Sequence, residues 1–213
     1  NIRDFTNYDD RQAKKILGRS LLNSELGCYL SHYGCVEKFL QTDADYLVVL
    51  EDDLRIDNNF SSTLQEILHY LHSQKNIEWS LINIAAKKNK ISREIFRTHD
   101  YSLVRAYYFP IRGVGLVWSR QGAHDFLKMA QNPCLPVDIF FQNWLIKNGK
   151  GLSIWPPLVR PAGLDSDILG TVATERVRRK QKENRDFSFF MKKQLRLLKN
   201  NILAYINFLS FKS

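Results

Sequence analysis

The chain has 213 residues, of which 44% are hydrophobic and 12% are aromatic. This composition excludes an intrinsically disordered protein, because it supplies enough apolar surface for a sizeable core. The net charge of +9 is uneven, since residues 172–213 hold 11 of the 31 Lys and Arg residues but 3 of the 22 Asp and Glu residues. Basicity is therefore a property of a tail over 172–213, and we expect one folded domain over residues 1–171.

Cysteine usage and hydropathy restrict the compartment. Cys28 and Cys35 would lie two helical turns apart, about 10 Å, which is too far to bridge. Together with Cys134 they form no zinc-like pair, so the cysteines favour a reducing compartment. The sequence has neither a signal peptide nor a run of about 20 apolar residues, so we expect neither secretion by that route nor a membrane span.

Hydrophobic spacing predicts strands that alternate with helices. Residues 1–23 are polar and weakly patterned. The predicted elements after them are a helix over 25–40, a strand over 46–50, a helix over 61–72, strands over 79–84, 101–109 and 113–119, helices over 120–129 and 137–147, and a strand over 152–155. This alternation is typical of an α/β fold.

Three consecutive carboxylates, Glu51, Asp52 and Asp53, follow the apolar run 46–50. That run fits a parallel strand covered on both faces, and the carboxyl ends of such strands commonly hold ligands. Strand alternation sends Glu51 and Asp53 to one side and Asp52 to the other. Converging carboxylate oxygens suit Mg²⁺ or Mn²⁺ together with substrate phosphates. A solvated acidic turn is the alternative interpretation.

The tail combines basic residues with apolar residues at helical spacing. Lys and Arg cluster over 176–182, and the apolar series that follows is Leu195, Leu198, Ile202, Ile206 and Leu209. A basic amphipathic helix of this kind can lie in an anionic membrane surface. The alternatives are a helix packed on its own domain or at a dimer contact. Nucleic acid is not expected as a partner, because the aromatic residues cluster with aliphatic ones instead of interleaving along a basic face.

Several segments resemble, in order and spacing, the bacterial lipopolysaccharide and lipooligosaccharide glycosyltransferases of family 25. They read SELGCYLSH at 24–32, LEDD at 50–53, GVGLVWSRQGA at 113–123 and PVD at 136–138, and DSDI at 165–168 resembles the closing motif of that family. The resemblance covers roughly residues 21–168. It implies a GT-A-like, Rossmann-related mixed sheet flanked by helices, and an inverting transfer of a sugar, typically galactose from UDP-galactose, onto a growing saccharide.

The implied reaction gives these segments chemical roles. A divalent cation, Mn²⁺ or Mg²⁺, must neutralise charge on the departing diphosphate. Asp53 is the first choice as its direct ligand, with Glu51 and Asp167 as further ligands. Asp138 is the candidate base for the acceptor hydroxyl, and a plain helix cap is its alternative interpretation. The residues assigned to the donor site are Glu25, Ser31, His32, Glu51 and Asp52.

Ordinary structural interpretations remain open for some of these positions. His32 can be a core residue, Asp167 can cap a turn, and Gly113 and Gly115 fit either a close ligand or a bulge. The resemblance also implies an apolar N-terminal strand that contributes to the nucleotide site, and nothing before Glu25 has that character. Either the sequence begins late or the strand is missing, and a non-catalytic binding or assembly protein on a truncated scaffold is the alternative function.

The resemblance and the tail together predict partners and a location. The partners are a UDP-sugar donor, a lipid-linked oligosaccharide acceptor and an anionic membrane surface that binds residues 172–213. The location is cytoplasmic, peripheral on the inner face of the bacterial inner membrane.

Overall fold

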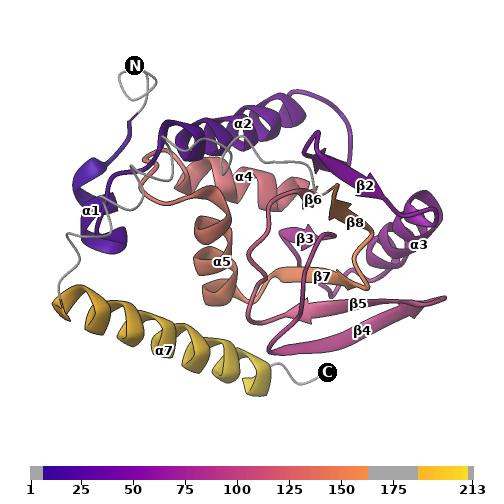
Figure 1. The fold of residues 1–213 in the computed structure, drawn as a ribbon. Helices are drawn as coiled ribbons and strands as arrows, with labels where there is room; N and C mark the ends of the chain where they lie inside the picture. Colours follow the sequence, from indigo (N-terminus) through magenta and orange to yellow (C-terminus); the bar gives the residue numbers. More distant parts are fainter. Residues whose placement is uncertain (1–6, 163–186, 211–213) are drawn as a thin grey trace.

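A six-stranded mixed sheet forms the centre of the protein, and helices flank both of its faces (Figure 1). The computed structural model describes residues 7–162 and 187–210. The strand order is β1-β6-β3-β7-β5-β4, in which β3 and β7 are parallel and the other neighbours antiparallel. The strands are β1 (Tyr46–Leu50), β3 (Leu81–Asn83), β4 (Ser92–Thr98), β5 (Tyr101–Ala106), β6 (Gly115–Ser119) and β7 (Gly151–Trp155). The predicted α/β class with a mixed, GT-A-like sheet is confirmed.

Side chains that alternate along the strands pack into two separate hydrophobic cores, one on each face of the sheet. On one face, Trp118 of β6 packs with Phe126, at 5.0 Å between ring centroids, beneath α2 (Asn23–Leu40), α4 (Arg120–Met129) and α5 (Val137–Asn148). On the other face, the adjacent Val117 packs with Ile67 of α3 (Phe60–Ser73). The two-residue period of a strand therefore decides which helix layer each side chain meets.

The predicted helices agree with the structure to within two residues at each end, whereas four short or polar elements escaped prediction. They are α1 (Asp10–Leu17), β2 (Leu54–Ile56), β4 and β8 (Val159–Pro161). Local capping defines α1, because the Asp9 side chain accepts from Gln12 N at 2.8 Å and Gly18 ends the helix at φ 70°. β2 and β8 pair over three residues each, which is too short for a hydrophobic period to show.

The prediction that residues 46–50 form a parallel strand covered on both faces is wrong. β1 is an edge strand that pairs antiparallel with β6, and Val48 and Leu50 are 38% and 36% exposed. A strand with one neighbour among the described residues retains open backbone and side-chain surface on its other edge. Because Leu50 lies opposite Gly115, the acids that follow β1 meet the segment that leads into β6.

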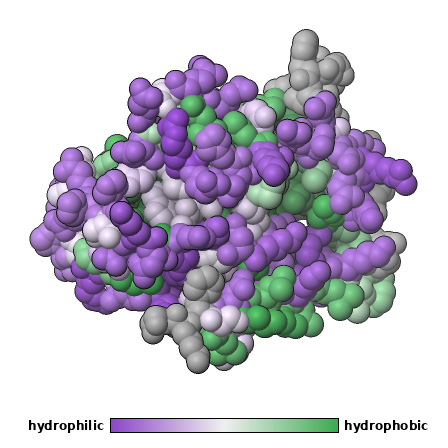
Figure 2. All heavy atoms as spheres, turned by 180° about the vertical axis from the view of Figure 1, so that it is seen from behind, coloured by the Kyte–Doolittle hydropathy of each residue, from purple (hydrophilic) through white to green (hydrophobic). Residues whose placement is uncertain are grey.

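The C-terminal helix α7 (Phe187–Ser210) packs on α5 by one face and leaves the opposite face open. Asn207 Nδ2 donates to Ile146 O at 2.7 Å, and Ala204 is fully buried. The predicted apolar series of the tail lies on the open face, where Figure 2 shows hydrophobic side chains gathered along the helix; its members are Leu195, Leu198, Ile202, Ile206 and Leu209. Both a packed helix and an exposed apolar stripe are therefore present. The boundary predicted at 171/172 lies outside the described residues.

No helix within residues 7–162 and 187–210 combines the length and the apolar composition that crossing a bilayer requires.

Alanine substitutions of two helical glycines should have opposite effects on the stability of the protein. A Cβ on Gly122 of α4 would lie 2.2 Å from Ser80 O, whereas a Cβ on Gly34 of α2 would meet nothing within 4 Å. Gly122→Ala should therefore destabilise the protein by about 1–3 kcal/mol through overpacking, and Gly34→Ala should stabilise it by about 0.5–1 kcal/mol through helix propensity. Thermal unfolding followed by circular dichroism measures both. A Gly122→Ala protein as stable as the parent would contradict the close contact between α4 and the strand layer.

Candidate active site

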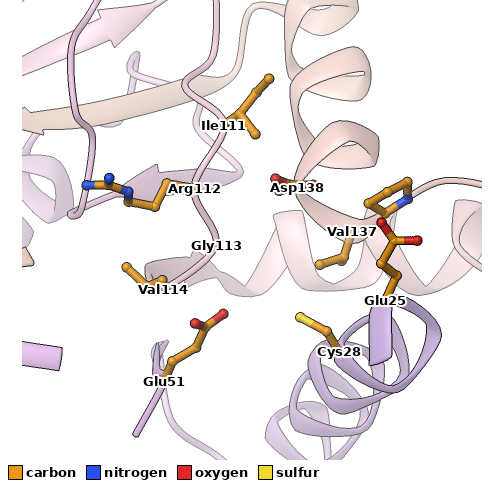
Figure 3. Close-up of a pocket in the computed structure, with 10 residues that line it drawn as sticks. Glu25, Cys28, Glu51, Ile111, Arg112, Gly113, Val114, Val137 and Asp138 are labelled. Carbon is orange, nitrogen blue, oxygen red and sulfur yellow. The ribbon is translucent and has the colours of Figure 1, made fainter. Parts of the chain in front are cut away.

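A cavity of about 360 Å³ lies where α2, the end of β1, the segment before β6 and the start of α5 converge (Figure 3). Among the predicted site residues, Glu25, Glu51 and Asp138 line it. They come from three elements that are far apart in the sequence, so the fold brings together three of the segments that sequence analysis had singled out. The complete lining is Glu25, Cys28, Glu51, Ile111, Arg112, Gly113, Val114, Pro136, Val137 and Asp138.

Glu51 is held at the cavity by the sheet. Its backbone N–H donates to Val114 O at 3.0 Å, which extends the β1–β6 pairing by one residue. Burial raises the pKa of its carboxyl, and the neighbouring charges of Asp53, Asp52 and Asp138 raise it further. This concentration of negative charge favours a cation at the site.

The carboxylates after β1 differ in position, since Glu51 lines the cavity whereas Asp52 and Asp53 are not among its lining residues. Asp53 lies close enough to Glu51 to perturb its titration more than any other charge, whereas Asp52 is exposed. One or two carboxylates completed by substrate phosphates are a usual set of ligands for Mg²⁺, so Glu51 and Asp53 are of the residue type that such an ion prefers. Asp167, the third predicted metal ligand, lies outside the described residues.

Asp138 lies both in the first turn of a helix and at the cavity. It lies in the first turn of α5, where its Oδ1 accepts from Ile139 N at 2.7 Å, and it also lines the cavity. Burial is the largest cause of a raised pKa, and the charge of Glu25 adds to it. A raised pKa brings a carboxylate closer to the value at which a general base is most effective near neutral pH.

Glu25 is fixed by contacts that sequence analysis did not anticipate. Arg19 donates to both of its carboxylate oxygens, at 2.6 and 2.7 Å, and Leu22 N donates to Oε2 at 2.9 Å. The largely buried Arg19–Glu25 pair sets the start of α2 beside the cavity. Arg19 lies in the weakly patterned N-terminal stretch, so no periodic signal marked it.

Arg112 is the second site residue that sequence analysis missed. It belongs to the lining of the cavity, but Figure 3 shows its side chain directed away from Glu51 and Asp138, and Nη1 donates to Ala85 O at 3.3 Å. The signal that could have found it is its place directly before the segment 113–123, which the resemblance singles out. A guanidinium can pair with a phosphate, but this one would have to turn toward the cavity to do so.

The other two residues predicted for the donor site differ in position. Ser31 is exposed and donates to Gly27 O at 3.0 Å within its own helix, so the structure does not bring it to the cavity. His32 is 3% exposed and packs edge-on against Phe141, at 5.6 Å between ring centroids. Burial lowers the pKa of His32 to about 4, which makes it a neutral imidazole behind the cavity wall.

Comparison with known proteins identifies the family. Residues 3–141 match the family described as glycosyltransferase family 25 (LPS biosynthesis protein). The chain belongs to glycosyltransferase family 25. The matched residues include α2, the acids after β1, the segment before β6 and the start of α5, so this family 25 match contains every element that forms the cavity.

Curated relatives of this family 25 protein carry both galactosyltransferase and inactive names. Procollagen galactosyltransferase 1 of Danio rerio is 36% identical over 127 residues, covering 58% of this chain and 20% of the relative. Procollagen galactosyltransferase 2 of Homo sapiens is 31% identical over 144 residues, covering 66% and 22%. A probable inactive glycosyltransferase 25 family member 3 of Bos taurus is 33% identical over 126 residues, covering 58% and 20%. The chain spans about a fifth of the length of these relatives.

Asp138→Asn should stabilise the protein at neutral pH. Asparagine keeps an oxygen for the Ile139 N–H but removes the charge that burial disfavours. Because folding raises the pKa of Asp138, the unfolded state loses its proton first. The buried charge of Asp138 therefore destabilises the parent fully above the pKa of the folded carboxyl. It has no effect on stability below the pKa of the unfolded carboxyl, about 3.9. The variant should have a higher Tm than the parent at pH 7, and the difference should close as the pH falls toward 4.

Thermal unfolding at both pH values measures this effect, and Asp43→Asn, at an exposed position, is the matched control. A lower Tm for Asp138→Asn at pH 7 would show that the helix terminus stabilises the ionised carboxylate by more than burial destabilises it.

Proposed function

We propose that this family 25 chain is an inverting, metal-dependent glycosyltransferase that moves galactose from UDP-galactose onto a lipooligosaccharide or lipopolysaccharide acceptor. The observation that carries the proposal is the cavity that Glu51, at the end of β1, and Asp138, at the start of α5, line together. The names of the relatives support galactose as the sugar, and the description of the family supports the lipopolysaccharide acceptor.

The donor diphosphate would bind at the acidic end of the cavity. Glu51 and Asp53 would hold Mn²⁺ or Mg²⁺ together with phosphate oxygens. When bound, the ion neutralises the charge that develops on the UDP leaving group. Arg112, in the lining of the same cavity, would supply a permanent cation for the diphosphate once its guanidinium turns toward the donor.

Asp138 would act as the general base of the transfer. Its carboxylate takes the proton of the acceptor hydroxyl while that oxygen forms a bond to the anomeric carbon. The bond from this carbon to the diphosphate oxygen breaks on the opposite face, and UDP leaves with the electron pair. One displacement of this kind inverts the anomeric configuration.

The open face of α7 would hold the enzyme at an anionic membrane surface, near a lipid-linked acceptor. The exposed apolar stripe lies opposite the face that packs on α5, and Lys192 and Lys199 are exposed beside it. Apolar side chains flanked by Lys fit the boundary between acyl chains and anionic headgroups. We propose a peripheral location at a cytoplasmic membrane face on this basis, with the bacterial inner membrane as the case that the lipopolysaccharide acceptor requires.

A non-catalytic binding or assembly protein is the second candidate function. Relatives named as inactive carry the same family name and are 33% identical over 126 residues and 32% identical over 77 residues, against 36% over 127 residues for a relative named galactosyltransferase. Calorimetry with UDP and Mn²⁺ separates the two: binding without turnover of UDP-galactose favours the second candidate.

Substitution of the two acidic groups tests the proposed enzyme. With Mn²⁺, UDP-galactose and a lactosyl- or N-acetylglucosamine-ended acceptor, the parent should release UDP, and procollagen serves as the competing acceptor. Asp53→Ala should abolish release, and Asp138→Asn should lower kcat by about 10²–10⁴-fold, the usual contribution of a general base. Asp43→Ala, in the exposed turn before β1, should leave turnover unchanged. Turnover that survives Asp53→Ala or a chelator would remove the carboxylates after β1 from the mechanism.

Two pairs of substitutions of equal charge test membrane attachment. Leu198 and Ile202 are 56% and 50% exposed on the open face of α7, whereas Gln194 and Asn201 are exposed beside it. Leu198→Asp with Ile202→Asp should lower binding to anionic phospholipid vesicles more than tenfold beyond the control pair, because each lost apolar contact costs about 1.5–3 kcal/mol. Gln194→Asp with Asn201→Asp gives the effect of charge alone. Equal losses of vesicle binding by the two pairs in a flotation assay would show that the attachment is electrostatic and does not depend on the apolar stripe.

A further inference from the structure

Three side chains of different ligand types meet at the wall of the cavity. Cys28 and His32 lie one turn apart on α2 and therefore share a face, and Glu51 approaches them from the end of β1. One ligand atom from each residue, a sulfur, a ring nitrogen and a carboxylate oxygen, lies within 4.8 Å of the others. Figure 3 shows Cys28 Sγ pointing toward Glu51. Among the described residues, this is the one cluster of three such side chains.

His32 provides a separate sign that the cluster accepts a ligand. Its side chain is 3% exposed, yet Nδ1 has no hydrogen-bond partner among the described residues. A buried polar atom without a partner is costly and calls for an explanation. The other ring nitrogen lies beside Gly113 of the cavity lining, since a Cβ at that position would be 3.5 Å from Nε2.

We propose that Cys28, His32 and Glu51 form a binding site for a borderline divalent cation such as Zn²⁺. Sulfur, imidazole nitrogen and carboxylate oxygen are the ligands of Zn²⁺ in proteins, whereas Mg²⁺ and Mn²⁺ prefer oxygen alone. Bond lengths of about 2.0–2.3 Å place the ligands of one tetrahedral ion roughly 3–4 Å apart, so small side-chain rotations close the cluster around it. Because Cys28 and Glu51 line the cavity, the fourth coordination position faces the cavity.

This site is distinct from the site proposed above for Mn²⁺ or Mg²⁺, but the two share Glu51. A cation bound by Cys28 and His32 withdraws that carboxylate from Asp53, so the two ions compete for one ligand. Binding at the cluster requires no sugar nucleotide and no turnover. Its experimental outcome is therefore independent of whether the proposed transferase activity is present.

Cobalt absorption identifies the ligands directly. The full chain, kept reduced, is titrated with Co²⁺ in place of Zn²⁺, since a thiolate bound to Co²⁺ produces a charge-transfer band in the near ultraviolet. The parent should show this band at one Co²⁺ per chain, and added Zn²⁺ should displace it. Cys28→Ser should lose the band, whereas Cys35→Ser, an exposed cysteine on the same helix, should keep it.

A second variant keeps the test decisive if Cys28→Ser fails to fold. Glu51→Gln changes a partly exposed ligand and should weaken Zn²⁺ binding by more than about tenfold, an effect typical even of an outer partner of a metal ligand. Calorimetry measures this affinity, and circular dichroism verifies the fold of each variant. Absence of the cobalt band in the parent, its persistence in Cys28→Ser, or unchanged Zn²⁺ affinity in Glu51→Gln would each overturn the proposal.

Discussion

The antiparallel pairing of β1 with β6 is the constraint on which the candidate site depends. It sets Leu50 opposite Gly115, and the next hydrogen bond, from Glu51 N to Val114 O, fixes Glu51 at the cavity. Gly115 also lets Val159 and Ile84 pack against this end of β6, because a Cβ there would lie 2.4 Å from Val159 Cγ2 and 2.9 Å from Ile84 Cγ1. A slip of one residue would turn Glu51 to the other face of the sheet, away from α2 and α5.

Sequence periodicity predicts the parts of this fold that bury long amphipathic segments. The helices α2 to α5 and the apolar strand β6 agree with prediction because each repeats its pattern over several residues. β4 pairs with the adjacent β5, but its polar residues show no strand period. β8 has three residues and takes its structure from β2, a partner distant in the sequence, so no local pattern marks it. The edge position of β1 escaped prediction for the same reason, since composition alone does not determine how many neighbours a strand has.

The sequence predicts which segments form the candidate site, but not which of their side chains contact one another. Glu51 and Asp138 were chosen on chemistry and resemblance, and the fold brings both to one cavity. The pairing of Arg19 with Glu25 joins residues that carry no shared pattern. The approach of Cys28 to Glu51 depends on the packing of α2 against the end of β1, which only tertiary structure defines.

Glu51 connects the electrostatics of the cavity with its chemistry. Carboxylates that gather without enough cations raise one another's pKa, as the causes of the shift at Glu51 illustrate. In the two proposed arrangements, a hard cation with phosphate would relieve this repulsion on the side of Asp53, whereas a borderline cation would relieve it on the side of Cys28 and His32. Because one carboxylate serves either arrangement, the ion present in solution would decide whether the cavity is arranged for diphosphate. The identity of the cation bound to Glu51 would then regulate the proposed sugar transfer at the same cavity.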